Sequence, residues 1–287
     1  MSILEVKNLT HTYGGNTPFI NDAVRDVSFS VDEGEIVGII GHTGSGKSTL
    51  VQHLNGLLKP TNGEIFIEEQ NIWEKPKEIR KVRSKVGLVF QYPEYQLFEE
   101  TVYADIGFGP KNMGLSGEEL DKRIRETCKI IGVKDEFLEK SPFDLSGGEK
   151  RRVAIAGVLA MNPKIIVFDE PTAGLDPKGR EDIIDVIYKY REATNATVII
   201  ISHSMEDMAQ ITDKLLVMNK GALAMCDKTE NIFKQGDALR EMGLNSPIVT
   251  RVFDQLKKQG IDLPDDVFTV ERAVEVLKNV KAGVHNA

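Results

Sequence analysis

Hydrophobic and polar residues alternate along three stretches near the start of the chain, which is the pattern of strands with one buried face. These stretches are residues 3–13, 24–31 and 63–69. Other stretches are almost continuously apolar and rich in β-branched residues, as is typical of strands covered on both faces of a parallel sheet. They are residues 35–40, 85–91, 164–170 and 197–202. The chain is therefore predicted to combine antiparallel strands with a buried parallel sheet.

Segments with helical periodicity alternate with the buried strands. Two of them begin with capping-box pairs, Ser116 with Glu119 and Ser146 with Glu149. Strands that alternate with helices indicate a doubly wound α/β core. A helical subdomain at about residues 92–162 is expected to interrupt the sheet. The predicted helices are residues 46–58, 116–132, 146–163 and 176–194.

The last part of the chain, residues 231–287, lacks buried-strand patterns. Residues 247–260 and 269–283 are predicted to form two short amphipathic helices. A segment of this size rarely carries a stable core alone, so it is expected to pack on the main domain or on a partner. Dimer contact is the hypothesis for its role. The predicted apolar faces hold Ile248, Val252, Leu256 and Val270, Ala273, Val274, Leu277.

Composition narrows the function classes. The chain has 287 residues, of which 41% are hydrophobic, so it can bury a large core. A net charge of −8 disfavours sequence-independent binding of nucleic acid, and no nucleic-acid partner is expected. Cys128 and Cys226 lack metal-ligand spacing, which favours reduced cytosolic thiols. Without a signal-peptide pattern or an apolar run near the roughly 20 residues of a membrane span, any membrane link is expected to be peripheral or through a partner.

The stretch "GHTGSGKST" matches the P-loop pattern G-x-x-x-x-G-K-[ST], after a predicted buried strand and at the start of a helix. Its glycines let backbone N–H groups close around phosphates, and the helix N-terminus adds partial positive charge. We expect Lys47 to reach the β- and γ-phosphates and Ser48 to ligate Mg²⁺. The alternative is a glycine-rich turn that only caps a helix. The predicted nucleotide-binding residues here are Gly41, His42, Thr43, Gly44, Ser45, Gly46, Lys47, Ser48 and Thr49.

Two acids end the buried strand at residues 164–170. Asp169 suits Mg²⁺ coordination through water, and Glu170 is expected to orient or deprotonate the water that attacks the γ-phosphate. Otherwise, two acids at a strand end are often a helix cap or a salt bridge. His203 follows the strand expected to lie beside the one that carries Glu170. It is predicted to position Glu170, water and γ-phosphate, although a lone histidine there is more often a turn residue.

The stretch "LSGGEKRR" begins at residue 145. Two glycines in a first helical turn each cost about 1 kcal/mol against alanine, which makes sense if bare backbone must approach a ligand. Ser146, Gly147 and Gly148 therefore predict a second phosphate-binding helix N-terminus. Because the P-loop already surrounds a triphosphate, the natural arrangement is a dimer. ATP would then lie between the P-loop of one chain and this segment of the other.

These motifs together resemble the ATP-binding-cassette (ABC) family, over about residues 1–230. The ordered set of P-loop, Gln91, "LSGGE", "DEPT", "AGLDP" and His203 carries the resemblance. It implies a P-loop cassette with a mixed-sheet core and an antiparallel β subdomain, followed by the helical extension at residues 231–287. Its implied ligands are ATP and Mg²⁺. Tyr13 matches the aromatic that stacks on adenine, and Gln91 the glutamine that senses Mg²⁺ and water and links to the membrane partner.

Within this family, residues 90–114 are similar to the energy-coupling-factor (ECF) ATPases that drive uptake of vitamins and transition-metal ions. Residues 16–27 and 41–63 look like the second of the two paired ATPases. The implied partners are a homologous ATPase, a transmembrane coupling subunit and a substrate-binding membrane subunit, at the cytoplasmic face of the membrane. The alternatives are a soluble ABC-type ATPase acting on nucleic acid or ribosomes, and a homodimeric ATPase of one dedicated transporter.

Residues 91–108, called the docking segment below, are predicted to grip helices of the coupling subunit. Tyr92, Tyr95 and Phe98 suit the core of an interface. Acidic side chains of the segment are expected to meet basic residues of that partner. Alternatively, the segment forms part of the core of the helical subdomain, and Phe98 and Val102 are the candidates for such core positions. The acids concerned are Glu94, Glu99 and Glu100.

Overall fold

The computed structural model describes residues 1–14 and 21–284, so residues 16–20 of the stretch 16–27 lie outside the described part. Two sheets form, with the strand orders β2-β1-β4-β5 and β10-β9-β3-β8-β7-β6. The first contains β1 (Ser2–Tyr13), β2 (Asn21–Asp32), β4 (Asn62–Ile67) and β5 (Gln70–Asn71). The second contains β3 (Ile36–Ile40), β6 (Val86–Val89), β7 (Ile165–Asp169), β8 (Thr197–Ile201), β9 (Lys214–Asn219) and β10 (Ala222–Lys228).

The six-stranded sheet is parallel from β9 to β6, and only β10 runs antiparallel to its neighbour. Strands β3, β6, β7 and β8 are almost wholly apolar and buried because both of their faces are covered, whereas β10 is largely exposed. On β7, Ile166 and Phe168 join the cluster beneath the helices, whereas Ile165 and Val167 join the cluster beneath the antiparallel sheet. Every predicted strand is present. The β9–β10 hairpin is an addition that the patterns did not predict.

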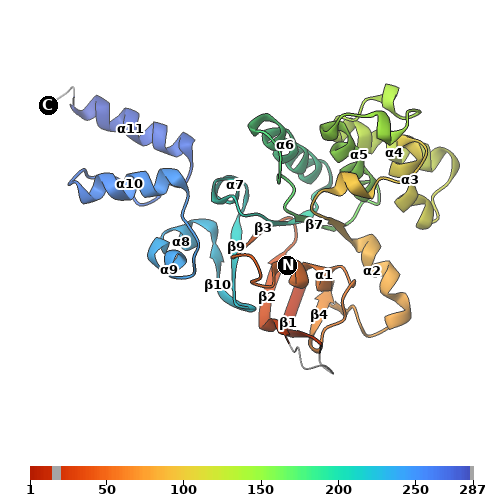
Figure 1. The fold of residues 1–287 in the computed structure, drawn as a ribbon, viewed down its shortest axis with the longest axis horizontal. Helices are drawn as coiled ribbons and strands as arrows, with labels where there is room; N and C mark the ends of the chain where they lie inside the picture. Colours follow the sequence, from red (N-terminus) through yellow and green to blue (C-terminus); the bar gives the residue numbers. More distant parts are fainter. Residues whose placement is uncertain (15–20, 285–287) are drawn as a thin grey trace.

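Helices α1 (Lys47–Leu54) and α2 (Ile79–Lys85) lie near the antiparallel sheet (Figure 1). Helices α6 (Pro177–Thr194) and α7 (Met205–Ile211) lie on the other side of the six-stranded sheet (Figure 1). Between residues 90 and 164, all of which are described, the structure has no strand. This region contains α3 (Val102–Asn112), α4 (Gly117–Ile131) and α5 (Gly147–Leu159). Short 3₁₀ turns lie at Pro76–Glu78, Pro93–Gln96, Asp135–Phe137 and Pro142–Asp144.

Three details of the predicted helices are wrong. The helix predicted over residues 146–163 ends at Leu159. The first helix ends at Leu54 rather than at residue 58, and the amide of Asn55 beyond it donates to the carbonyl of Val86. The capping box at Ser116 does not form. Gly117 has a positive φ of 57°, so the first turn departs from the geometry that would present its N–H groups to the Ser116 hydroxyl. The second capping box does form, since the backbone N–H and the hydroxyl of Ser146 donate to Glu149.

After β10, α8 (Thr229–Phe233) and α9 (Gly236–Glu241) lead to α10 (Ile248–Lys258) and α11 (Val270–Val284), which project from the edge of the molecule (Figure 1, blue). These last two helices share a small apolar cluster around Phe253 and Val276. Contact with the main domain runs through the Ile248 N–H, which donates to Glu206 (3.0 Å), and through Phe268 beside Phe233.

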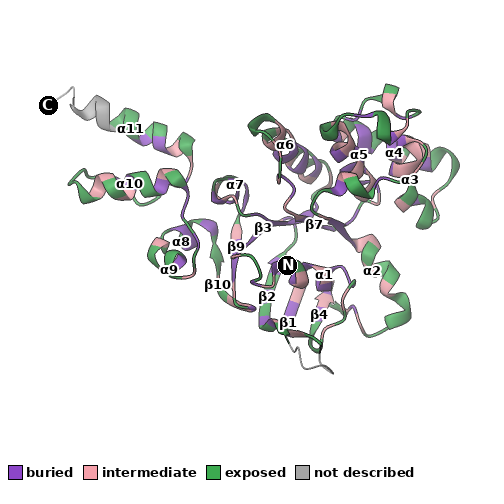
Figure 2. Cartoon of the chain, viewed as in Figure 1, coloured by how far each residue is buried: buried purple, intermediate pink, exposed green. Residues whose placement is uncertain are grey.

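The predicted apolar faces of the last two helices are buried only in part. Ala273 is buried and Leu256 is half-buried in the small cluster. The other predicted positions are exposed: Ile248, Val252, Val270, Val274 and Leu277. Exposed residues, coloured green, recur along both α10 and α11 in Figure 2. No helix in the described part of the chain is both long and apolar enough to cross a membrane.

Candidate functional site

The P-loop connects β3 to α1 and is held tightly against the antiparallel sheet. Gly46 has φ of 98°, and a Cβ atom there would lie 2.2 Å from the carbonyl oxygen of Ala23. Lys47 is buried, and its Nζ donates to the carbonyls of Gly41 (2.7 Å) and His42 (3.1 Å). Burial lowers the pKa of Lys47, while the charges of Glu170 and Asp169 oppose that shift. The loop thus holds a cation at its centre, where phosphate oxygens could replace the carbonyls.

Acidic and imidazole groups gather at the carboxyl ends of β7 and β8. These strands are parallel neighbours, as predicted, and His203 Nε2 lies 3.1 Å from Glu170 Oε1. Burial raises the pKa of Glu170 to about 7, against the opposing effects of the His203 backbone and the charge of Lys47. Burial also raises the pKa of Asp169, while a hydrogen bond from Ser48 and the charge of Lys47 lower it. Glu170 is therefore a poorly solvated carboxylate, suited to accept a proton.

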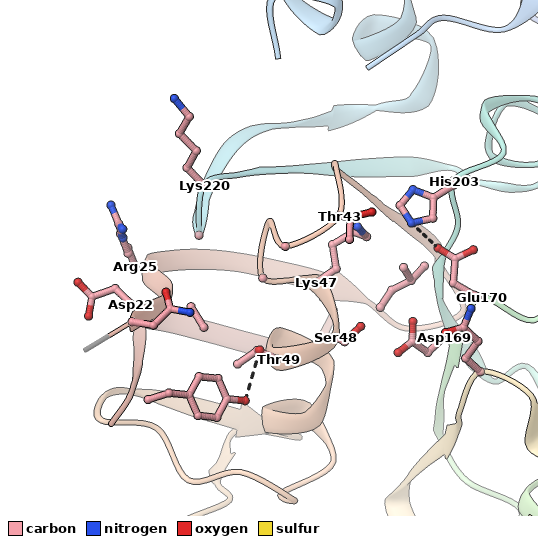
Figure 3. A pocket seen from close by; sticks show the side chains of 18 residues that line it. Asp22, Arg25, Thr43, Lys47, Ser48, Thr49, Asp169, Glu170, His203 and Lys220 are labelled. Atoms are coloured by element: carbon pink, nitrogen blue, oxygen red, sulfur yellow. Dashed lines mark hydrogen bonds and ion pairs between the residues drawn. The ribbon is translucent and has the colours of Figure 1, made fainter. Parts of the chain in front are cut away.

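These groups line one cavity of about 670 Å³. Figure 3 shows Thr43, Lys47 and Ser48 opposite Asp169, Glu170 and His203. The predicted residues on its wall are Tyr13, Thr43, Gly44, Gly46, Lys47, Ser48, Thr49, Gln91, Asp169, Glu170 and His203. Three P-loop residues are not on the wall: Gly41, His42 and Ser45.

The two remaining P-loop side chains face the protein. Ser45 is fully buried, and His42 contacts Asn219 through Nε2 (3.3 Å). Ser146, Gly147 and Gly148 are exposed and are not on the wall of this cavity. A Cβ atom on either glycine would meet no heavy atom within 4 Å. Packing within the chain therefore does not explain the two glycines.

Several cavity residues were not predicted from the sequence. Asp22, Arg25 and Lys220 lie at the end of the cavity away from Glu170 (Figure 3). The backbone N–H of Arg25 donates to Gly221 (2.7 Å) and so joins the antiparallel sheet to the β9–β10 turn. The sequence does contain a signal for this hairpin. Asn-Lys-Gly at residues 219–221 lies between two apolar-rich runs, which is typical of a β-hairpin turn.

Tyr13 is supported by two histidines. Its hydroxyl lies 3.4 Å from the Thr49 hydroxyl (dashed in Figure 3), and the His11 ring packs edge-on against its ring at a centroid distance of 4.5 Å. His53 Nδ1 donates to the carbonyl of Thr49 (2.7 Å), so His53 Nε2 can accept a hydrogen bond from His11 Nδ1 (3.0 Å). The helix that follows the P-loop thereby orients the half-exposed ring of Tyr13.

The buried His53 makes the folded chain sensitive to acid. Burial lowers its pKa from 6.5 to about 4, against the effect of the Thr49 carbonyl, and the neighbouring His11 lowers it further. Because the unfolded chain binds the proton more tightly, the stability that neutral His53 contributes is present above pH 6.5 and is lost as pH falls toward 4. Between pH 7 and pH 5 we expect this residue to lower the free energy of unfolding by about 2 kcal/mol.

Urea unfolding of wild type and His53→Gln at both pH values measures this effect. The wild type should lose about 2 kcal/mol more than the variant on acidification. Equal losses would show that His53 does not carry the proton linkage.

The oxygen donors at the cavity fit Mg²⁺. The Ser48 hydroxyl, the Asp169 carboxylate and the Gln91 amide line the same wall, and Ser48 is hydrogen-bonded to Asp169. Mg²⁺ is commonly held by one or two protein carboxylates, waters and substrate phosphates rather than by a complete protein cage. This chain would supply such a partial set.

Comparison with known proteins agrees with this geometry. The ABC transporter family profile matches residues 24–173. The chain is 49% identical to the energy-coupling factor transporter ATP-binding protein EcfA2 of Caldanaerobacter subterraneus subsp. tengcongensis, with 99% of each chain covered. It is 51% identical to the protein of the same name from Clostridioides difficile, with 98% of each covered.

Solved structures give the same result. The cbiO1 protein of Clostridium perfringens, part of the ABC transporter complex cbiONQ, superposes with a TM-score of 0.75 at 35% identity and covers 89% of this chain and 99% of its own. The ATP-binding cassette MJ0796, in a dimeric post-hydrolysis state with ADP and Pi, superposes with a TM-score of 0.70 at 33% identity over 79% and 98%. The chain therefore belongs to the ABC transporter family, and within it to the ECF transporter ATP-binding proteins.

Proposed function

We propose that this chain is the ATP-binding and ATP-hydrolysing subunit of an ECF importer that takes up a vitamin or a transition-metal ion. The observation that carries the proposal is one cavity in which the P-loop, Asp169, Glu170 and His203 meet, with Gln91 joining that cavity to the docking segment. Relatives at 49–51% identity named as ECF ATP-binding proteins support the transporter class.

The residues have distinct roles in hydrolysis. Lys47 would neutralise charge on the β- and γ-phosphates, and Glu170 would take a proton from the attacking water. His203, at 3.1 Å from Glu170, would hold the carboxylate and the water in place. Ser48, Asp169 and Gln91 would hold Mg²⁺, whose charge offsets that of the phosphates.

A homologous cassette would complete the site. The exposed Ser146–Gly148 segment has no intrachain reason for its glycines and is not on the wall of the chain's own cavity, so it would bind the nucleotide held by a partner's P-loop. The dimeric MJ0796 structure supports this arrangement. The exposed apolar side chains of α10 and α11 would add a dimer contact.

The docking segment would bind a transmembrane coupling subunit, which in turn works with a substrate-binding membrane subunit. The chain would then lie at the cytoplasmic face of the membrane as a peripheral subunit. Tyr95 is 84% exposed and Phe98 is 58% exposed, although Phe98 also packs edge-to-face on Phe108 (4.9 Å). Asp105 fixes the backbone beneath them by accepting from the N–H groups of Phe98 and Glu99 (3.0 Å each). Val102 is fully buried, as the core alternative expected.

One predicted partner contact is wrong. Glu94 does not face outward as a free acid but forms an ion pair with Arg151 (2.9 Å) inside the chain. Glu100 is exposed and Glu99 is half-buried, and both stay candidates for basic residues of the coupling subunit.

The docking segment can be tested by truncating its exposed aromatic side chains. Tyr95→Ala and Phe98→Ala should each weaken assembly with the membrane subunits by about 30-fold, the cost of a central interface aromatic. Charge reversal by Glu99→Lys should also lower assembly and uptake, while nucleotide binding by the chain stays intact. Pull-down from detergent and substrate uptake into proteoliposomes measure these effects.

The matched control is Leu57→Ala, which truncates an exposed apolar side chain outside the docking segment. If the three docking variants assemble and transport as this control does, the docking proposal fails.

A further inference from the structure

Arg151 is a buried cation that the functions above do not use. It lies on α5, five residues after Ser146, and its side chain is only 3% exposed. Burying an arginine costs free energy unless each of its donors finds a partner. The partners of this guanidinium come from two segments that are far apart in the sequence.

The first partner is the docking segment. Arg151 Nε and one terminal nitrogen donate to the two carboxylate oxygens of Glu94, each at 2.9 Å. This bidentate geometry is the strong form of an arginine–carboxylate pair. Glu94 is itself 18% exposed, and the Arg151 guanidinium carbon lies 5.7 Å from the centre of the Tyr92 ring. The pair is therefore largely desolvated and bound to the docking segment at two points.

The second partner is the turn that follows Glu170. The other terminal nitrogen of Arg151 donates to the carbonyls of Ala173 (2.9 Å) and Pro171 (3.4 Å). The Ala173 N–H in turn donates to the carbonyl of Glu170 (3.1 Å). The turn is therefore hydrogen-bonded to the backbone of the predicted catalytic residue. Thr172 anchors the other side of the turn by donating to Asp207 (3.2 Å).

We propose that Arg151 is a positioning residue that links the docking segment to the turn behind Glu170. This inference rests on the proposed docking function. When the coupling subunit moves the docking segment, Glu94 moves the guanidinium, and the guanidinium moves the carbonyls of Pro171 and Ala173. The position of Glu170 then depends on whether the membrane subunits are bound. Glu94, which was predicted from the sequence to contact the partner, thus connects the docking segment to Arg151 inside the chain.

The quantity to measure is the stimulation ratio, defined as the ATP hydrolysis rate of the assembled transporter divided by that of the ATPase pair alone. Glu94→Gln keeps the shape of the side chain but removes its charge, and Arg151→Met removes the guanidinium. Each should lower the ratio by roughly 2- to 30-fold, the range for residues on a coupling network. The double variant should lower it no further, because both changes break the same link. Arg151→Lys, which keeps the charge without the fork, should restore part of the ratio.

The matched control is Arg152→Met. Arg152 is the next residue on α5, but it pairs with Asp182 of α6 (3.4 Å) instead of the docking segment. Its loss should leave the ratio unchanged. Because Arg151→Met leaves a carboxylate without its cation and can unfold the chain, thermal melting is measured for each variant, and Glu94→Gln carries the test independently.

The two proposals fail in different ways. If the wild type is stimulated and Glu94→Gln changes both rates by the same factor, Arg151 has a structural role alone and the inference is wrong. If the membrane subunits assemble with the wild type but do not stimulate it, this inference fails and the docking proposal stands. If they do not assemble with it, both proposals fail.

Discussion

Replacing Glu170 with glutamine is expected to slow ATP hydrolysis in the assembled transporter by about 10²–10⁴-fold. Glutamine keeps the size of the side chain and its ability to hydrogen-bond to His203, but it cannot take a proton from water. Because the P-loop is untouched, the variant should still bind ATP and hold the two cassettes closed. Single-turnover hydrolysis measures the rate, and size-exclusion chromatography with and without ATP measures the closed dimer.

The control for this variant is Glu181→Gln, which neutralises an exposed acid on α6. It should hydrolyse ATP at the wild-type rate. The assignment of Glu170 is wrong if Glu170→Gln does the same in the assembled complex.

Replacing Ser146 with arginine is expected to reduce nucleotide trapping about 10²-fold at the P-loop of the partner, and not at the P-loop of the same chain. The larger side chain would occupy the open space at the N-terminus of α5, where a partner's nucleotide is expected. Mixed dimers, in which only one chain carries the change, separate the two sites. Trapped nucleotide is then quantified for each P-loop.

Ser116→Arg is a close control for this experiment, since Ser116 also precedes a helix and is exposed. It should trap nucleotide at both sites. Loss of trapping at the P-loop of the chain that carries Ser146→Arg, with the partner's site intact, would contradict the composite site.

The strands and the nucleotide cavity could be predicted because their signals are local. The apolar runs of β3, β7 and β8 follow from burial on both faces. The P-loop and the acids after β7 are short motifs whose roles depend on the strand and helix that carry them. Parallel pairing of neighbouring strands then brings His203 to Glu170.

Contacts between distant residues were beyond such patterns. Glu94 and Arg151 are 57 positions apart, and no periodicity marks them as partners. The acid was therefore assigned to an external interface. The failed capping box at Ser116 has a similar cause, because the box depends on the conformation of Gly117, which a four-residue pattern does not contain.

The backbone of Glu170 has a consequence for how such a site can evolve. Its φ of 54° lies in the left-handed region, which glycine and asparagine occupy more easily than other residues. Replacing the carboxylate by one of these residues would relieve strain there and would also remove a poorly solvated acid. A duplicated gene can therefore lose hydrolysis at this position without losing the fold. Evolution can thus readily produce paired cassettes in which one site does not hydrolyse ATP. Replacement of Glu170 by a β-branched residue is not an accessible route to this outcome.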